Sequence, residues 1–171
     1  YIAEHPIYYH WWPLFTVLLG TGTRIGECLA LRWEDLDFEN RIITVNHSLT
    51  YRPTLETGSS EMRISLPKTE AGIRTIPMLD VVKDAFEILR EEQEDTGYNE
   101  QIIDGMYGFV FKNRFGEVPR PHTINQAIKR IVGSYNSAEI LLAKKERREP
   151  LVLPNFSCHI LRHTFATRLC E

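Results

Sequence analysis

The sequence predicts a mainly helical α+β fold that contains a small three-stranded antiparallel sheet. Apolar residues recur at helical spacing in the first 31 residues and again after residue 80. Between these regions, three short runs rich in β-branched residues are separated by turn-forming segments. The 171 residues are 43% hydrophobic and 25% charged, as in ordinary globular proteins. We therefore expect a single domain with its own core over residues 1–171.

The N-terminal region predicts two helices. Ile7–Gly20 is apolar enough for a buried helix, and Gly20 and Gly22 end it. Thr23 is placed to cap a second helix that runs to Leu31, because its hydroxyl can accept a hydrogen bond from a free amide of the first turn. The longest apolar stretch, Trp11–Gly20, is interrupted by Pro13 and is about half as long as a membrane-spanning helix, so no transmembrane segment is expected.

Three antiparallel strands are predicted next, at Ile42–Val45, Met62–Leu66 and Ile73–Ile76. The polar residues Thr69–Gly72 predict a tight reversal between the second and third strands. Tyr51–Ser60 is rich in Gly, Ser, Thr and Pro and predicts a longer excursion between the first two.

The remaining chain predicts three more helices. Asp80 is placed to cap the first, which ends at Gly97. Thr123–Arg148 predicts the second, with an irregularity near Gly133–Ser134. Pro150 and Pro154 then prevent its continuation, and Ser157 is placed to cap a final helix.

Charge is divided unevenly along the chain, although the net charge is only −3. Residues 1–119 carry 11 Lys and Arg against 19 Asp and Glu, whereas residues 120–171 carry 9 against 4. Residues 80–104 hold 2 bases and 9 acids, which is typical of a solvated face turned away from a polyanion. The C-terminal third is therefore the better candidate for phosphate contact.

The three cysteines, Cys28, Cys158 and Cys170, are an odd number without the spacing of a disulfide framework. This pattern favours free, mostly buried thiols and a reducing cytoplasmic location.

Two arginines lie near predicted helix starts, Arg24 within Thr21–Glu27 and Arg162 within Cys158–Thr167. Free amides and the helix dipole already favour an anion at such a place. Two guanidiniums on one phosphate would supply the electrostatic stabilisation that phosphoryl transfer requires. His159 is three residues before Arg162, so both side chains share one helix face.

The order of these motifs resembles the catalytic domain of tyrosine recombinases, the phage integrase family. The residues that carry the resemblance are Thr21-Gly22-x-Arg24-x-x-Glu27, Leu31-x-Trp33, Lys68-Thr69 on the expected hairpin, Arg74-x-Ile76-Pro77, and His159-x-Leu161-Arg162-His163-Thr164-Phe165-Ala166-Thr167. The resemblance runs from about His10 to the last residue. Ala138–Pro154 is similar to integrases of conjugative transposons, a type of mobile element.

The resemblance implies a role for each of five residues. Arg24 and Arg162 would hold the non-bridging oxygens of the scissile phosphate, and His159 would donate a hydrogen bond or a proton there. Lys68 would be the general acid that protonates the departing 5′-hydroxyl. Glu27 would orient the side chains of the site. No metal or cofactor is implied.

The resemblance also implies site-specific recombination of duplex DNA through a 3′-phosphotyrosyl link, by copies that self-associate on DNA as a tetramer. All seven tyrosines, at positions 1, 8, 9, 51, 98, 107 and 135, precede Arg162. The family's nucleophilic tyrosine follows that arginine. We therefore expect a partial catalytic domain that is inactive alone, without the C-terminal tyrosine segment and without the family's N-terminal DNA-binding domain.

Other interpretations stay open from the residues alone. Lys68 and Glu27 could be ordinary solvated side chains, Arg74 could pair structurally with a neighbouring acid or contact DNA, and His163 could bond the backbone. His159 and His163 have the i, i+4 spacing of zinc ligands beside Cys158, but Ile160 stands where zinc proteases have glutamate. Cys158 beside His159 could form a thiol and base pair, although adjacent helix residues point apart. Non-catalytic DNA-binding or regulatory fragments and type IB topoisomerases are the rival functions.

Overall fold

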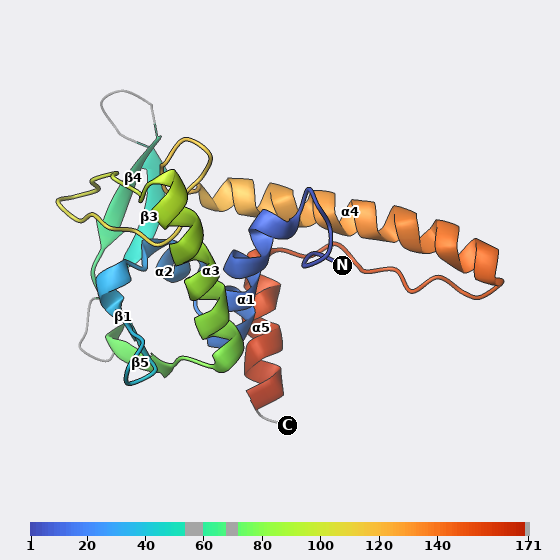
Figure 1. Ribbon diagram of the computed structural model, residues 1–171, viewed down its shortest axis with the longest axis horizontal. Helices are drawn as coiled ribbons and strands as arrows, with labels where there is room; N and C mark the ends of the chain where they lie inside the picture. The colour runs from blue at the N-terminus through green and yellow to red at the C-terminus, as the bar shows by residue number, and fades with distance from the viewer. Residues whose placement is uncertain (54–59, 68–71, 170–171) are drawn as a thin grey trace.

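The computed structural model describes residues 1–53, 60–67 and 72–169 of the chain. Its helices are η1 (Tyr9–Trp11), α1 (Trp12–Thr21), α2 (Ile25–Ala30), η2 (Trp33–Asp35), α3 (Asp80–Thr96), α4 (Pro121–Glu146) and α5 (Cys158–Leu169). Its strands are β1 (Leu36–Asp37), β2 (Ile42–Val45), β3 (Ser48–Pro53), β4 (Ser60–Ser65) and β5 (Arg74–Pro77). The predicted α+β class, mainly helical with a small antiparallel sheet, is confirmed (Figure 1).

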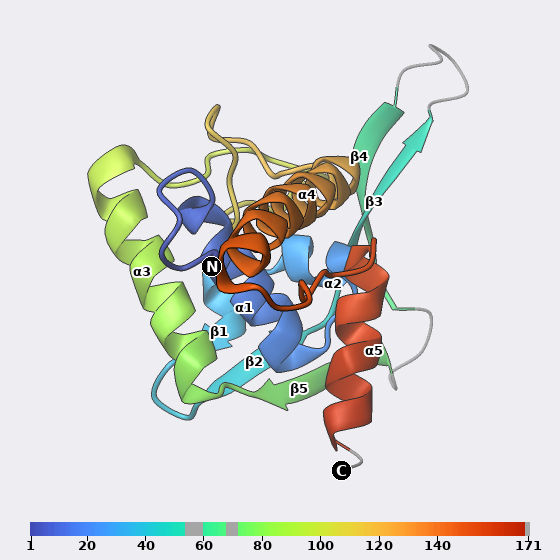
Figure 2. The ribbon, with the colours of Figure 1, turned by 90° about the vertical axis from the view of Figure 1, so that its right-hand side faces the viewer.

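The strands form two sheets, and their membership differs from the prediction. A three-stranded antiparallel sheet has the order β1-β2-β5, whereas β3 and β4 pair only with each other. The predicted strand Met62–Leu66 therefore belongs to a two-stranded ribbon, which projects from the body in Figure 2. The excursion predicted from Tyr51 is in part the strand β3, whose Leu49 lies opposite Ile64. The predicted reversal at Thr69–Gly72 lies mostly outside the described residues.

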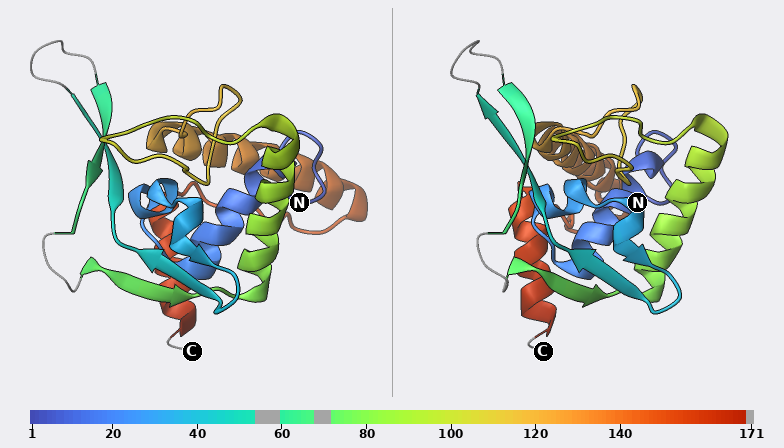
Figure 3. Two further views of the ribbon diagram at one scale, coloured as in Figure 1. Left: turned by 60° about the vertical axis from the view of Figure 1, so that its left-hand side comes forward. Right: turned by 90° about the vertical axis from the view of Figure 1, so that its left-hand side faces the viewer.

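The core forms around α1, which contacts both α3 and α5. Val17 and Leu18 of α1 are buried together with Phe86 of α3 and Ile43 of β2. An α-helix that is apolar on every face is stable only when other elements cover it. In Figure 3, β2 and β5 run between α5 and α3 and cover a further side of this core.

Two helix predictions need correction. The first helix begins at Trp12 and not at Ile7, which is 67% exposed. Pro13 marks this start, because proline fits the first helical turn, where no amide hydrogen bond is lost. The predicted irregularity near Gly133–Ser134 is also wrong, because α4 continues without a break through these residues. A single glycine costs about 1 kcal/mol relative to alanine, which does not interrupt so long a helix.

Two predicted caps are also wrong. Thr23 is buried and its hydroxyl is paired with that of Thr21 at 2.9 Å, while Arg24 holds the N-cap position of α2. Asp80 is already inside α3, and its carboxylate accepts from the guanidinium of Arg41 at 2.8 Å. Thr23 is therefore paired with a residue of the same turn, whereas the partner of Asp80 is distant in the sequence.

The far half of α4 extends away from the body, and residues 147–157 return beside it (Figure 1). The side-chain amide of Asn136 binds this return segment at Leu153. It donates to the carbonyl of Leu153 at 2.9 Å and accepts from the amide of Leu153 at 2.8 Å. Glu139 accepts from both terminal nitrogens of Arg148 and from the amide of Leu151. We call α4 after Gly133 together with residues 147–157 the arm.

None of the helices in the described ranges has the length and apolar character that crossing a lipid bilayer requires.

Candidate active site

The site begins at the turn Thr21-Gly22-Thr23 between α1 and α2. Gly22 ends α1 in the left-handed conformation, with φ 60°, and its amide donates to the carbonyl of Leu18 at 3.1 Å. Glycine adopts this conformation without the steric cost of a Cβ. The turn directs the chain into α2 and places Arg24 at the N-terminus of that helix.

Glu27 holds Arg24 in two ways. Its Oε2 accepts from the backbone amide of Arg24 at 2.9 Å, and its Oε1 accepts from the guanidinium of Arg24 at 3.1 Å. The side chain of Glu27 is 10% exposed, whereas that of Arg24 is 64% exposed. The carboxylate is therefore inside the fold, while most of the guanidinium faces solvent.

Arg74 of β5 is the second arginine on the same carboxylate. Its Nη2 donates to Oε2 of Glu27 at 2.6 Å and its Nη1 donates to Oε1 at 3.3 Å. Burial alone raises the pKa of Glu27, but hydrogen bonds from Arg74 and from the amide and side chain of Arg24 outweigh burial and lower it. The interpretation of Arg74 as the partner of a neighbouring acid is thus confirmed, and the acid is Glu27.

Helix α5 brings Arg162 to the same turn. The Nη1 of Arg162 donates to the carbonyl of Gly22 at 2.6 Å, two residues before Arg24. A Cβ built on Gly22 would lie 2.1 Å from the ring of Phe165, so α5 packs directly on this glycine. Glycine at this position is therefore needed for both the backbone conformation and the close approach of α5.

The start of α5 is fixed by α4. The helix begins at Cys158, as predicted, and the amide of Cys158 donates to Oδ1 of Asn125 at 3.0 Å. The capping acceptor that the structure shows is thus on a distant helix, whereas Ser157 was the predicted one. Asn125 thereby helps to set the position of the helix that carries His159 and Arg162.

A hollow of about 490 Å³ lies between the end of α1, strand β5 and helix α5. Arg74 and Arg162 both line it, together with Gly22, Phe165 and Ala166. Arg24 and His159 do not line it. Arg162 therefore contacts the turn and lines the hollow, whereas Arg24 follows the turn in the chain and lies outside the hollow.

His159 is exposed on the first turn of α5, and its ring meets that of His163 edge to face, with centroids 4.4 Å apart. Throughout the described ranges, no three His, Cys, Asp or Glu side chains come together as a metal site would require. Cys158 is buried, and burial raises the pKa of its thiol to about 11. A thiol with this pKa is protonated near neutral pH, which disfavours the thiol and base pair.

Lys68 lies outside the described residues, so its predicted role remains a prediction. Sequence reasoning also gave Arg74 no place in the site. Its position in the Arg74-x-Ile76-Pro77 motif was the available signal, but the motif does not reveal that β5 faces Glu27 of α2.

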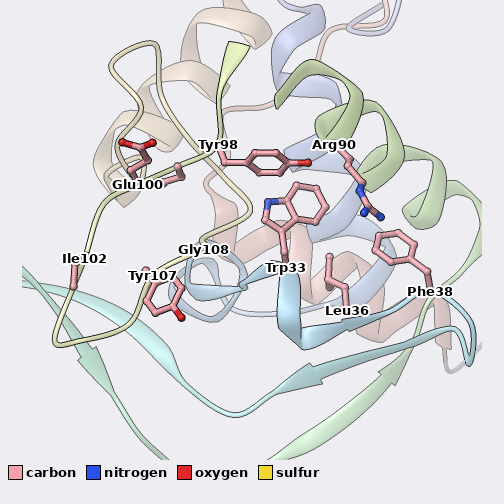
Figure 4. Close-up of a pocket in the computed structure, with 10 residues that line it drawn as sticks. Trp33, Leu36, Phe38, Arg90, Tyr98, Glu100, Ile102, Tyr107 and Gly108 are labelled. Atoms are coloured by element: carbon pink, nitrogen blue, oxygen red, sulfur yellow. The ribbon is translucent and has the colours of Figure 1, made fainter. Parts of the chain in front are cut away.

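A second hollow, of about 650 Å³, lies away from these residues and contains none of the predicted site residues (Figure 4). Trp33, Leu36, Phe38 and Tyr98 supply apolar surface, and Arg90 of α3 points toward Phe38 at its rim. The ring of Trp33 meets that of Tyr98 edge to face, with centroids 6.2 Å apart.

Comparison with known proteins agrees with the motifs. The chain matches the phage integrase family over residues 2–171. The transposase from transposon Tn916 of Enterococcus faecalis is 34% identical over 152 residues, which cover 88% of this chain and 33% of that protein. A XerC-like tyrosine recombinase of Caldanaerobacter subterraneus is 29% identical over 165 residues, which cover 92% of this chain and 38% of the relative.

Solved structures show the same likeness. The integrase of transposon Tn1549 in complex with transposon right end DNA superposes with a TM-score of 0.82 at 34% identity, covering 99% of this chain and 49% of that one. The chain thus spans about a third of the Tn916 transposase and about half of the Tn1549 integrase chain. The match over nearly all of the sequence, the motifs around Arg24 and Arg162, and the shared fold lead to one conclusion: this chain belongs to the phage integrase family of tyrosine recombinases.

Proposed function

We propose that this chain forms part of the catalytic domain of a site-specific recombinase of a mobile element. The recombinase would cut and rejoin duplex DNA through a 3′-phosphotyrosyl link. The observation that carries the proposal is the docking of Arg162 on the turn that precedes Arg24. The Tn1549 integrase, which shares this fold, has been solved with transposon DNA, which supports DNA as the substrate.

In the proposed reaction a tyrosine oxygen attacks the scissile phosphorus, and the bond to the 5′-oxygen breaks. Arg24 and Arg162 hold the non-bridging oxygens, where charge develops in the transition state. His159 hydrogen-bonds the same phosphate, and Lys68 gives a proton to the departing 5′-oxygen. Rejoining reverses these steps on the partner strand. Because no tyrosine of this chain follows Arg162, the nucleophile would come from a further segment of the recombinase.

The finer features of the proposal concern assembly and location. Copies of the recombinase would associate on DNA, as a tetramer in the recombining complex. The basic residues after 119 would face the phosphates, and the acidic α3 would face away. The buried free thiols of Cys28 and Cys158 fit a reducing cytoplasm.

Covalent trapping on DNA tests this function. A recombinase that carries this chain with its tyrosine segment is incubated with labelled target DNA and analysed on a denaturing gel. We expect an adduct that is insensitive to chelators, is lost when the nucleophilic tyrosine becomes phenylalanine, and falls about 10³-fold or more when Arg24 or Arg162 becomes alanine. DNA binding without any adduct would favour the non-catalytic alternative, and an adduct on this chain alone would show that the nucleophile is misassigned.

A further inference from the structure

We propose that Arg74 is a positioning residue for the strand-cleavage reaction, acting on Arg24 through the carboxylate of Glu27 without touching the phosphate. This inference rests on the proposed function, because it assumes that Arg24 binds the scissile phosphate. It adds to the site a residue of β5, to which the resemblance assigns no role in the reaction.

The three side chains form a chain of contacts between two elements. Arg74 lies on β5, opposite Val45 of β2, so the sheet fixes its backbone. Glu27 lies on α2, and its carboxylate accepts hydrogen bonds from both terminal nitrogens of Arg74, at 2.6 and 3.3 Å. The same two carboxylate oxygens also accept hydrogen bonds from the backbone amide and the guanidinium of Arg24. The sheet therefore sets the orientation of the carboxylate, and the carboxylate sets the orientation of Arg24.

The two arginines differ in how much of each guanidinium is available. Arg74 uses both terminal nitrogens on Glu27, and its side chain is 33% exposed. Arg24 uses one terminal nitrogen, and its side chain is 64% exposed. A guanidinium has five N–H donors, so Arg24 keeps most of them for a phosphate. The geometry gives Arg74 the holding role and Arg24 the binding role.

Charge makes this arrangement depend on Arg74. Within the described residues, Arg24 and Arg74 are the charged groups in contact with Glu27. Arg162 lines the hollow beside Arg74, and the titratable residue next to Glu27 in α2 is Cys28. Burial raises the pKa of the Cys28 thiol, so this neighbour is neutral. Without Arg74, Glu27 would keep its burial but lose its largest stabilising partner, and its pKa would rise.

The consequence is a pH dependence with a defined sign. In the unchanged protein the lowered pKa keeps Glu27 ionised as the pH falls. In an Arg74→Gln variant the pKa is higher, so Glu27 gains a proton as pH falls through that value and releases Arg24. Cleavage by the variant should then decline about tenfold per pH unit below the new pKa, down to the level of a Glu27→Gln variant.

The test has two readouts. In this chain, ¹³C NMR titration measures the pKa of Glu27 in the unchanged protein and in the Arg74→Gln and Arg74→Lys variants. In the recombinase that carries the chain, adduct formation is measured against pH for the same variants and for Glu27→Gln. The matched control is Arg148→Gln, because Arg148 makes the same two-nitrogen contact with another largely covered carboxylate, Glu139, on the remote arm.

We expect Arg74→Gln to raise the pKa of Glu27 and to move the acid limb of cleavage upward. Arg74→Lys should shift the pKa of Glu27 and the acid limb of cleavage less than Arg74→Gln does. Arg148→Gln should change neither the pKa nor the acid limb. Adding Arg74→Gln to Glu27→Gln should cause no further loss. If Arg74→Gln does not fold, the Arg74→Lys variant is compared alone, since a lysine keeps the charge but not the two-nitrogen contact.

An Arg74 variant that keeps the normal Glu27 pKa and pH profile overturns this inference and leaves the proposed function intact. A loss of cleavage by the same factor at every pH also overturns it, because a direct contact with phosphate or a general loss of structure would act in that way. If the unchanged recombinase forms no adduct, the proposed function itself fails, and the NMR titration still decides whether Arg74 governs Glu27.

Discussion

Replacing Gly22 by alanine should lower the free energy of unfolding more than the same change at a glycine that has a positive φ but no close neighbour. The left-handed backbone, with φ 60°, costs an alanine about 1–2 kcal/mol. The new Cβ would also lie 2.1, 2.7 and 2.8 Å from three ring carbons of Phe165. Forcing a methyl group into such a contact costs about 1–3 kcal/mol more. The free energy of unfolding should therefore fall by about 2–5 kcal/mol.

Urea unfolding followed by circular dichroism measures this loss, and Gly116→Ala is the matched control. Gly116 also has a positive φ, 80°, but a Cβ there would meet nothing within 4 Å, so only the backbone cost of about 1–2 kcal/mol should appear. In a Phe165→Ala background, Gly22→Ala should lose the extra cost, because the ring is gone. Equal losses at Gly22 and Gly116, whatever residue 165 is, would refute the packing of α5 on this turn.

Three further predictions concern the helix start, the arm and DNA. Asn125→Ala removes the acceptor for the amide of Cys158 and should lower the free energy of unfolding by about 1 kcal/mol, measured by thermal unfolding, whereas no change would contradict the cap. Hydrogen bonds from Arg148 and from the amide of Leu151 lower the pKa of Glu139 from 4.5 to about 2, so this stabilisation of the arm is complete above pH 4.5 and is lost as pH falls toward 2. The protection of the Leu153 amide from hydrogen exchange, taken relative to its intrinsic rate at each pH, should fall over that range, and Glu139→Gln should make it low at every pH. This chain alone should bind duplex DNA with a dissociation constant on the order of micromolar to millimolar that rises with salt, and tight salt-insensitive binding would contradict this.

Local sequence patterns predicted the elements better than their pairing. Residues 80–97 show helical periodicity that ends at a glycine, and α3 ends at Thr96 with Gly97 in a positive-φ conformation. Strand pairing depends on contacts between residues far apart in the chain. The segment Met62–Leu66 alternates like a strand, but its sequence does not name its partner. In the structure β4 pairs with β3, which packs against α2, and not with β5.

The site was predictable where its residues belong to one motif. Glu27 lies three residues after Arg24, and the structure shows the contact that this spacing allows. Arg74 and Asn125 act across elements, on Glu27 and on the amide of Cys158, and a single sequence holds no local signal for such pairs. The same reason explains the wrong cap at Asp80, whose partner Arg41 is distant in the sequence. The cap at Thr23 fails for a local reason, because its hydroxyl is paired with that of Thr21, two residues earlier.

The most direct measurement is a structure of the recombinase that carries this chain, bound to its target DNA. We expect the guanidiniums of Arg24 and Arg162 to donate to non-bridging oxygens of one phosphate, with His159 on the same group and Glu27 still holding Arg24. Arg24 and Arg162 on different phosphates, or either one turned away from the DNA at the cleaved strand, would contradict the assignment of this site.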